Sequence, residues 1–267
     1  MKPEGFLQTM VRITQDAVAH NRRTLPLAML RKQAENRPAG PDFYKAMAQS
    51  TSEDVGIIAE IKKASPSKKD ICLDLDPHTY TRECEKAGAR AISVLTEPVY
   101  FKGSLTDLKT ACAATHLPVL RKDFVISAYQ IYQAKQAGAG SVLLITTLLS
   151  RNQQADYTRL ARELGMEPLV EISSEWECEQ ALITGARVIG INNRNLATLA
   201  VDPDTALRVA PVLPAYILPV AASGISCRQD IKTAVDAGIY NFLVGESIVR
   251  ATDRKAFLCA LLQDAAV

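Results

Sequence analysis

The stretch GIIAEIKKASPSKKD, residues 56–70, begins as a buried strand and then turns to charge. Side chains alternate between the two faces of a β-strand, so Ile58, Glu60 and Lys62 share one face and the residues between them share the other. Both faces are apolar until the strand nears its end, which is typical of a parallel sheet covered by helices. The charged residues therefore mark the carboxyl end of a strand in such a sheet.

Seven further runs of this kind follow, and a stretch that suits a helix separates each from the next. By residue number they are 91–96, 118–125, 141–146, 167–172, 188–193, 216–223 and 241–247. A weak repeat supports the pattern, because KAGARAISVL, QAGAGSVLLI, ITGARVIGI and DAGIYNFLVG each place a helix-ending glycine shortly before a strand. Eight units favour an α/β fold closed into a (β/α)8 TIM barrel. A doubly wound open sheet is the alternative, but it usually needs a glycine-rich turn where KKASPSKKD stands.

The beginning of the chain has a different pattern, with no strand-like run. Phe6, Met10 and Ile13 are spaced as on one face of a helix. We therefore expect residues 1–267 to form a single (β/α)8 barrel domain, with residues 1–50 as an N-terminal helical extension.

The composition argues against several classes of protein. The 267 residues are 48% hydrophobic and 22% charged, as in a globular protein with a large core. The net charge of +2 and the scattered lysines and arginines argue against a nucleic-acid partner. No apolar run approaches the roughly 18 residues that span a bilayer, and the N-terminus lacks the apolar segment of a signal peptide. We expect a cytoplasmic protein without a membrane partner.

Motifs typical of metal and nucleotide enzymes are missing from the sequence. The six cysteines lie far apart, without C-x-x-C or a zinc-like spacing to histidine, so reduced thiols are the simplest interpretation. The chain has no G-x-G-x-x-G, P-loop or H-E-x-x-H motif. We therefore expect neither a metal site nor a cofactor.

Five strands end in side chains that a core does not require, at the end where (β/α)8 barrels carry their active sites. By alternation the residues that face inward together are Glu60 and Lys62 with Ile58, Lys122 with Leu120, Glu171 with Leu169, Asn192 and Arg194 with Gly190, and Ser223 with Ala221. Any one alone is typical of a strand end that meets water, but five on one face predict a shared site. Two lysines and two glutamates in a partly desolvated mouth shift each other's pKa values, which suits proton transfer.

The last two strands end in small residues just before a helix. They read Ser223-Gly224 and Gly245-Glu246-Ser247. Backbone N–H groups at such turns bind anions, and barrels often place a phosphate site after the seventh and eighth strands. A small phosphorylated substrate is therefore expected.

Several long motifs in order resemble the indole-3-glycerol phosphate synthase family. They are IIAEIKKASPSK, YFKGSLTDL, LRKDFVISAYQIYQAKQAGA, LVEIS, IGINNRNLATLAVD and FLVGESIV, and PLAML and DFYKAM resemble the N-terminal extension of that family. The resemblance implies a (β/α)8 barrel with an extra helical segment over the catalytic mouth. It also implies ring closure of 1-(2-carboxyphenylamino)-1-deoxyribulose 5-phosphate, with loss of carbon dioxide and water and no cofactor, in tryptophan biosynthesis.

The resemblance also implies roles for the residues that match the family's motifs. Lys122 resembles the general acid, and Glu171 the group that removes a proton in the dehydration. Lys62 would bind the substrate carboxylate or phosphate, Glu60 would orient the lysines, and Asn192 and Arg194 would complete the polar wall. Contacts to the aromatic end or its loops would come from Ser65, Phe101, Leu143 and Leu196. Phosphate would be held by Lys62, Ser223, Gly224, Gly245 and Glu246, the last through its backbone N–H.

Three positions depart from the family pattern. Ala222 stands where the family has a catalytic glutamate, Lys69 where it has glycine, and Glu97 where it has aspartate. Two hypotheses stay open: a working synthase, or a diverged paralogue that binds a phosphorylated sugar-like ligand with altered or lost catalysis. A Schiff-base aldolase that uses Lys122 is a third. We expect a monomer or weak dimer.

Overall fold

Eight parallel strands close into a barrel in the computed structural model, which describes residues 5–194 and 200–263. Around the barrel the strands follow the order β1-β10-β9-β8-β7-β6-β5-β4. Their bounds are β1 Gly56–Ile61, β4 Ala91–Leu95, β5 Val119–Lys122, β6 Ser141–Ile145, β7 Glu167–Ile172, β8 Val188–Asn192, β9 Leu218–Ala222 and β10 Asn241–Val244. Each predicted run holds one of these strands, so the (β/α)8 prediction is confirmed and the open sheet is wrong.

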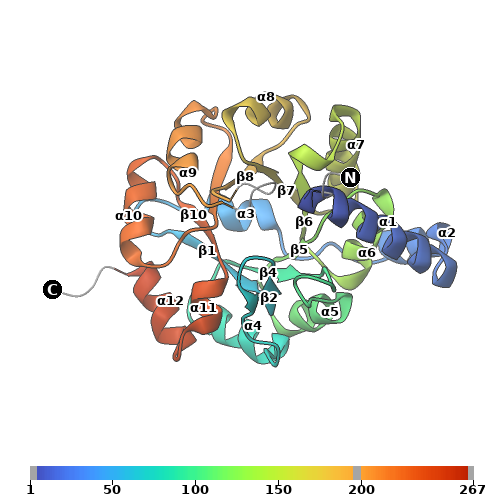
Figure 1. The fold of residues 1–267 in the computed structure, drawn as a ribbon, viewed down its shortest axis with the longest axis horizontal. Helices are drawn as coiled ribbons and strands as arrows, with labels where there is room; N and C mark the ends of the chain where they lie inside the picture. The colour runs from blue at the N-terminus through green and yellow to red at the C-terminus, as the bar shows by residue number, and fades with distance from the viewer. Residues whose placement is uncertain (1–4, 195–199, 264–267) are drawn as a thin grey trace.

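Helices surround the barrel on its outer side (Figure 1). They are α4 Pro77–Lys86, α5 Leu105–Ala114, α6 Ala128–Ala137, α7 Arg151–Glu163, α8 Glu175–Ile183, α9 Asp204–Val209, α10 Arg228–Asp236 and α12 Arg254–Leu262. Local sequence signals fix their ends: the side chain of Ser127 accepts a backbone N–H at the start of α6, and Gly138 ends it with a φ of 104°.

The sequence reasoning missed several short elements. These are the hairpin of β2 Ala64–Ser65 and β3 Lys69–Asp70, the helix α11 Glu246–Arg250, and the 3-10 helices η1 Thr146–Leu148 and η2 Ala210–Val212. Such elements are too short for periodicity to reveal. Backbone hydrogen bonds close the hairpin at its base, where the carbonyl of Lys63 accepts the N–H groups of Ile71 and Cys72.

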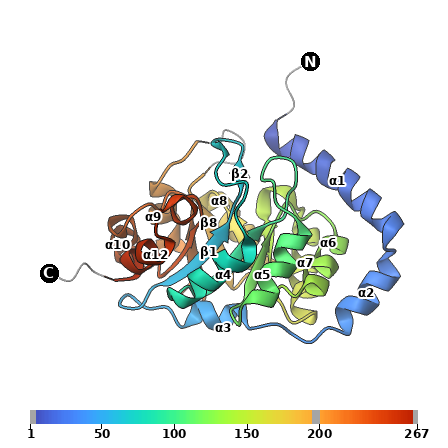
Figure 2. The ribbon, with the colours of Figure 1, turned by 90° about the horizontal axis from the view of Figure 1, so that it is seen from below.

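The N-terminal helices run from the mouth of the barrel, along its side, to its floor (Figure 2). They are α1 Phe6–Thr24, α2 Leu27–Glu35 and α3 Phe43–Ala48. Phe43 and Met47 of α3 are fully buried in the same apolar cluster as the inner residues of the barrel. The extension was expected over the mouth of the barrel. Only the start of α1 reaches the mouth, and α3 closes the opposite end.

Two apolar clusters separate the inside of the barrel from its outside. Ile58 belongs to the inner cluster, and its strand neighbours Ile57 and Ala59 belong to the outer cluster, as alternation predicts. The described part of the chain contains no helix with the length and apolarity needed to cross a membrane.

One predicted alignment is wrong. Ala221 lies in the outer cluster and Ala222 in the inner one, so Ala221 does not share the inner face with Ser223. Ser223 reaches the mouth because its φ is 71°, a left-handed conformation that ends the alternation of β9.

Candidate active site

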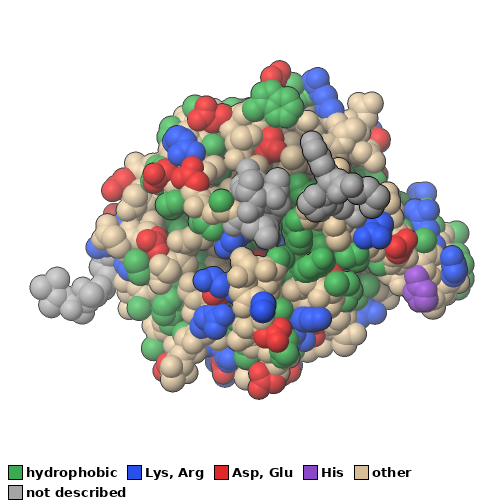
Figure 3. Space-filling view, in the orientation of Figure 1, with side chains coloured by type: hydrophobic (Ala, Val, Ile, Leu, Met, Phe, Trp, Pro, Cys, Tyr) green, Lys and Arg blue, Asp and Glu red, His purple; other side chains and the backbone are tan. Residues whose placement is uncertain are grey.

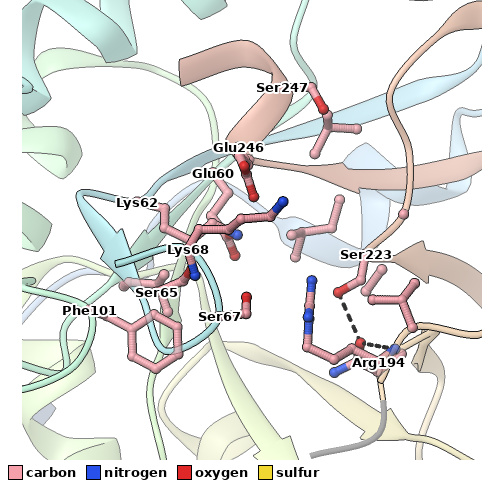
Figure 4. A pocket seen from close by; sticks show the side chains of 18 of the residues that line it. Glu60, Lys62, Ser65, Ser67, Lys68, Phe101, Arg194, Ser223, Glu246 and Ser247 are labelled. Atoms are coloured by element: carbon pink, nitrogen blue, oxygen red, sulfur yellow. Dashed lines mark hydrogen bonds and ion pairs between the residues drawn. The ribbon is translucent and has the colours of Figure 1, made fainter. Parts of the chain in front are cut away.

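A cavity of about 380 Å3 opens at the carboxyl ends of the strands. Its walls come from the ends of β1, β5, β8, β9 and β10, from the β2–β3 hairpin, and from Phe6 at the start of α1. On this face, basic side chains gather near the hairpin and hydrophobic side chains lie between them and α1 (Figure 3). In the close view, Phe101 and Ser65 lie on one side of the cavity, while Ser223 and Arg194 lie on the other (Figure 4).

The centre of the site is a chain of alternating charges. The Nζ of Lys122 lies 3.8 Å from Oε2 of Glu60 and 3.7 Å from Oε2 of Glu171, and the Nζ of Lys62 lies 2.6 Å from Oε1 of Glu60. Both carboxylates are buried. Buried charges need partners, and each of the two carboxylates has at least one ammonium beside it.

The pKa values follow from this arrangement. Burial by itself would raise the pKa of Glu60, but the ammonium groups of Lys62 and Lys122 outweigh it, and the pKa is lowered overall. Burial by itself would lower the pKa of Lys122, but Glu171 and Glu60 outweigh it, and the pKa is raised overall. At neutral pH, Lys122 is therefore an ammonium that can donate a proton, and Glu60 is a carboxylate.

Hydrogen bonds extend the polar array to β9. The Nδ2 of Asn192 donates to Oε1 of Glu171 over 3.0 Å. The Oδ1 of Asn192 accepts from the hydroxyl of Ser223 at 3.0 Å and from the backbone N–H of Arg194 at 2.9 Å. The expected residues of five strands thus lie side by side in one array.

Small residues form the turn after β9 and the end of β10. Gly224 has a φ of 85° and follows Ser223, whose φ is also positive. A Cβ added to Gly245 would lie 2.5 Å from Oε1 of Glu60, so only glycine allows this close approach. The carboxylate of Glu246 accepts a hydrogen bond of 3.0 Å from Arg250, which leaves the backbone N–H at the start of α11 as the group an anion would approach.

Aromatic rings form the wall opposite these turns. Phe6, Phe101 and Phe124 all line the cavity. The ring centroids of Phe6 and Phe124 lie 6.1 Å apart, and those of Phe101 and Phe124 lie 6.2 Å apart. Such a wall suits a flat aromatic group.

The predicted site residues fall into three groups. Those that line the cavity are Glu60, Lys62, Ser65, Phe101, Lys122, Asn192, Arg194, Ser223, Gly224, Gly245 and Glu246. Glu171 contacts Lys122 from just behind the lining, and Leu143 packs deeper in the barrel, one inward-facing layer below Glu171. Leu196 lies outside the described residues.

Sequence reasoning missed other residues that line the cavity, among them Phe6, Lys68, Phe124 and Arg250. Phe124 had a signal, because it follows Lys122 by two positions, as a side chain on the same face does. Phe6 had none, since only the path of the N-terminal helices brings it to the mouth.

The described residues contain no cluster of His, Cys, Asp or Glu that is able to hold a metal ion. The six cysteines are free thiols.

Solved structures with a similar fold include the thiamine phosphate pyrophosphorylase of Pyrococcus furiosus, with a TM-score of 0.59 at 16% identity. That match covers 79% of this chain and 95% of the other. At this level of identity the likeness supports the barrel fold alone.

Sequence comparisons identify the family as well as the fold. The family described as indole-3-glycerol phosphate synthase matches residues 7–261. The indole-3-glycerol phosphate synthase of Desulfosudis oleivorans is 47% identical over 96% of this chain and 98% of its own length. That of Carboxydothermus hydrogenoformans is 44% identical over 96% of this chain and 99% of its own. By these matches, which span nearly the whole sequence, the chain belongs to the indole-3-glycerol phosphate synthase family.

Proposed function

We propose that this carboxy-lyase of the indole-3-glycerol phosphate synthase family uses Lys122 as its general acid on 1-(2-carboxyphenylamino)-1-deoxyribulose 5-phosphate. The observation that carries the proposal is the ammonium of Lys122, which lies between two buried carboxylates in the mouth of the barrel. A group that stays protonated but is poorly hydrated is suited to deliver a proton to a substrate oxygen.

The two ends of the cavity would orient the substrate. The phosphate would bind the N–H groups of the turns at Ser223, Gly224, Gly245 and Glu246, with Lys62 as a cation nearby. The carboxyphenyl ring would lie against the aromatic wall near Phe101, with Ser65 in the hairpin beside it and Arg194 in the polar wall. The reacting carbons would then lie between these ends, next to Lys122.

The charged residues would act in sequence during ring closure. Protonation of the ketone oxygen by Lys122 makes its carbon more electrophilic toward the aromatic carbon that carries the carboxylate. Loss of carbon dioxide restores the aromatic ring. Once Lys122 has regained a proton from solvent, it protonates the new hydroxyl, which leaves as water, while Glu171 removes a proton to complete the indole. Glu60 and Asn192 would hold Lys62, Lys122 and Glu171 in place through the contacts described above.

Lys122 as a Schiff-base nucleophile is the less favoured candidate. A nucleophilic amine must be neutral, and aldolase lysines are activated by a lowered pKa. The carboxylates around Lys122 raise its pKa instead. Treatment with borohydride in the presence of substrate would trap an imine on Lys122, and no trapped adduct is expected.

The position of Ala222 keeps the paralogue hypothesis open. Ala222 lines the cavity and carries no acid where the family pattern has glutamate. Purified wild type and Ala222→Glu should be assayed for indole fluorescence with the carboxyphenylamino-deoxyribulose phosphate. We expect turnover by the wild type. An inactive wild type with activity restored in Ala222→Glu would instead establish a diverged paralogue.

The cytoplasmic location, the monomeric or weakly dimeric state, the single-domain organisation and the lack of a nucleic-acid partner stay predictions from the sequence.

A further inference from the structure

A hydrogen-bonded cluster lies behind Lys122, on the outer side of the barrel. The cluster consists of Thr96, Arg121 and Asp123, and all three side chains are buried. Arg121 and Asp123 are the two strand neighbours of Lys122, so they point outward where Lys122 points inward. Thr96 follows β4, which pairs with β5 in the register Leu95 to Lys122.

The hydroxyl of Thr96 joins the two charged residues. It donates to Oδ2 of Asp123 over 2.6 Å and accepts from Nε of Arg121 at 3.2 Å. The same Oδ2 accepts from Arg121 at 2.8 Å, so the three side chains form a closed triangle. A buried ion pair whose remaining donors and acceptors are satisfied by hydrogen bonds has one well-defined geometry.

The cluster is anchored to the backbone on several sides. The backbone N–H of Thr96 donates to the carbonyl of Lys122 itself over 3.1 Å. Arg121 donates to the carbonyl of Gln130 on α6 over 2.6 Å, and Oδ1 of Asp123 accepts from the N–H of Phe124 at 2.8 Å. The backbone is therefore fixed before, at and after Lys122.

Packing alone does not supply this rigidity. A second cavity of about 230 Å3 lies against the cluster beneath α1, and Thr96, Arg121 and Asp123 all line it. The cavity separates the cluster from part of α1, so the hydrogen bonds contribute to the positional constraint on that side.

The tip of Lys122 needs such a constraint. Its two carboxylate partners are 3.7 and 3.8 Å away, beyond the 2.7 to 3.2 Å of a good N–H···O hydrogen bond. Charge attraction at this distance holds the ammonium in the mouth without fixing its direction. The position of the ammonium therefore also depends on the backbone from which the side chain starts.

We infer that Thr96, Arg121 and Asp123 are positioning residues that aim Lys122 at the substrate from outside the barrel. The inference rests on the proposed role of Lys122 as general acid. A misplacement of about 1 Å at a catalytic group can cost about 100-fold in rate, so loss of the cluster is expected to lower kcat and leave KM nearly unchanged.

Thr96→Val tests this inference with little change of shape, because it removes only the hydroxyl that closes the triangle. We expect kcat to fall about tenfold or more with KM within about twofold, and Thr96→Ser to restore kcat. Thr158→Val is the matched control, since Thr158 on α7 is buried and its hydroxyl has no hydrogen-bond partner among the described residues. This control should keep the wild-type kcat.

A double mutant separates positioning from a general structural effect. In the Lys122→Met background, Thr96→Val should cause no further loss of kcat, because there is no ammonium left to aim. An equal loss in both backgrounds, or a wild-type kcat in Thr96→Val, would overturn the inference. Failure of the proposed function is distinguishable, since Lys122→Met alone would then retain the wild-type kcat.

Discussion

Replacing Lys122 with methionine is the sharpest perturbation of the proposed site. Methionine fills a similar volume but carries neither the charge nor the proton. The two carboxylates at 3.7 and 3.8 Å each attract the ammonium by about 4 kcal/mol at an effective dielectric constant of about 20. This attraction outweighs the loss of hydration, because the pKa of Lys122 is raised. The acid is therefore fully protonated at neutral pH, and its removal should abolish the whole contribution of the general acid to kcat.

The expected loss follows from the usual contribution of a general acid. Such groups contribute about 100- to 10,000-fold to a rate, which is about 3 to 5.5 kcal/mol of transition-state stabilisation. We expect Lys122→Met to lower kcat in this range when product is followed by indole fluorescence. Lys122→Arg should lose nearly as much, because arginine keeps the positive charge but does not release a proton near neutral pH.

Lys135→Met is the control for loss of a buried lysine. Lys135 on α6 is also buried, and its Nζ donates to the carbonyl of Pro38 over 2.9 Å, far from the mouth. The Lys135→Met substitution should lower the free energy of unfolding without changing kcat. A folded Lys122→Met enzyme with a kcat within about threefold of wild type would refute the assignment of the acid.

Three further predictions concern stability. Glu60→Gln should lower the free energy of unfolding by about 3 to 5 kcal/mol near neutral pH, because Lys62 loses its counter-charge and Lys122 loses one of its two. The pKa of Glu60 is lowered in the folded protein. Urea unfolding should therefore show a constant difference in the free energy of unfolding between variant and wild type above pH 4.5, the ordinary pKa. This difference should shrink as the pH falls through the pKa of Glu60 in the folded protein. Lys69→Gly should slow proteolysis of the hairpin, because the φ of 52° at Lys69 costs a non-glycine residue about 1 to 2 kcal/mol. The control Lys68→Gly should speed proteolysis. Equal rates for the two variants would contradict backbone strain at Lys69. Glu167→Gln at the start of β7 should cost about 1.5 to 3 kcal/mol of stability with kcat unchanged, because the buried carboxylate accepts hydrogen bonds from the partly exposed Arg162 and Arg187; an unchanged urea midpoint would contradict this.

Much of the candidate site was accessible from strand alternation. Glu60, Lys122 and Glu171 each lie two residues beyond an inner apolar residue of their strand, and this short-range rule holds wherever the backbone stays extended. The rule failed for Ala221, which faces outward although Ser223 reaches the mouth, because the positive φ of Ser223 ends the alternation. A backbone conformation of this kind is set by the turn and has no periodic signal in the sequence.

The sequence by itself determined the order of strands and helices, the inward polar residues at the strand ends and, through long motifs, the family. Those features depend on local propensity and periodicity, which act over a few residues. Only the tertiary structure decided that α3 closes the floor, that Phe6 reaches the mouth, and that Lys122 lies between Glu60 and Glu171. These arrangements depend on closing the barrel, because closure brings together residues that lie more than 100 positions apart in the chain and sets distances that the sequence pattern does not carry.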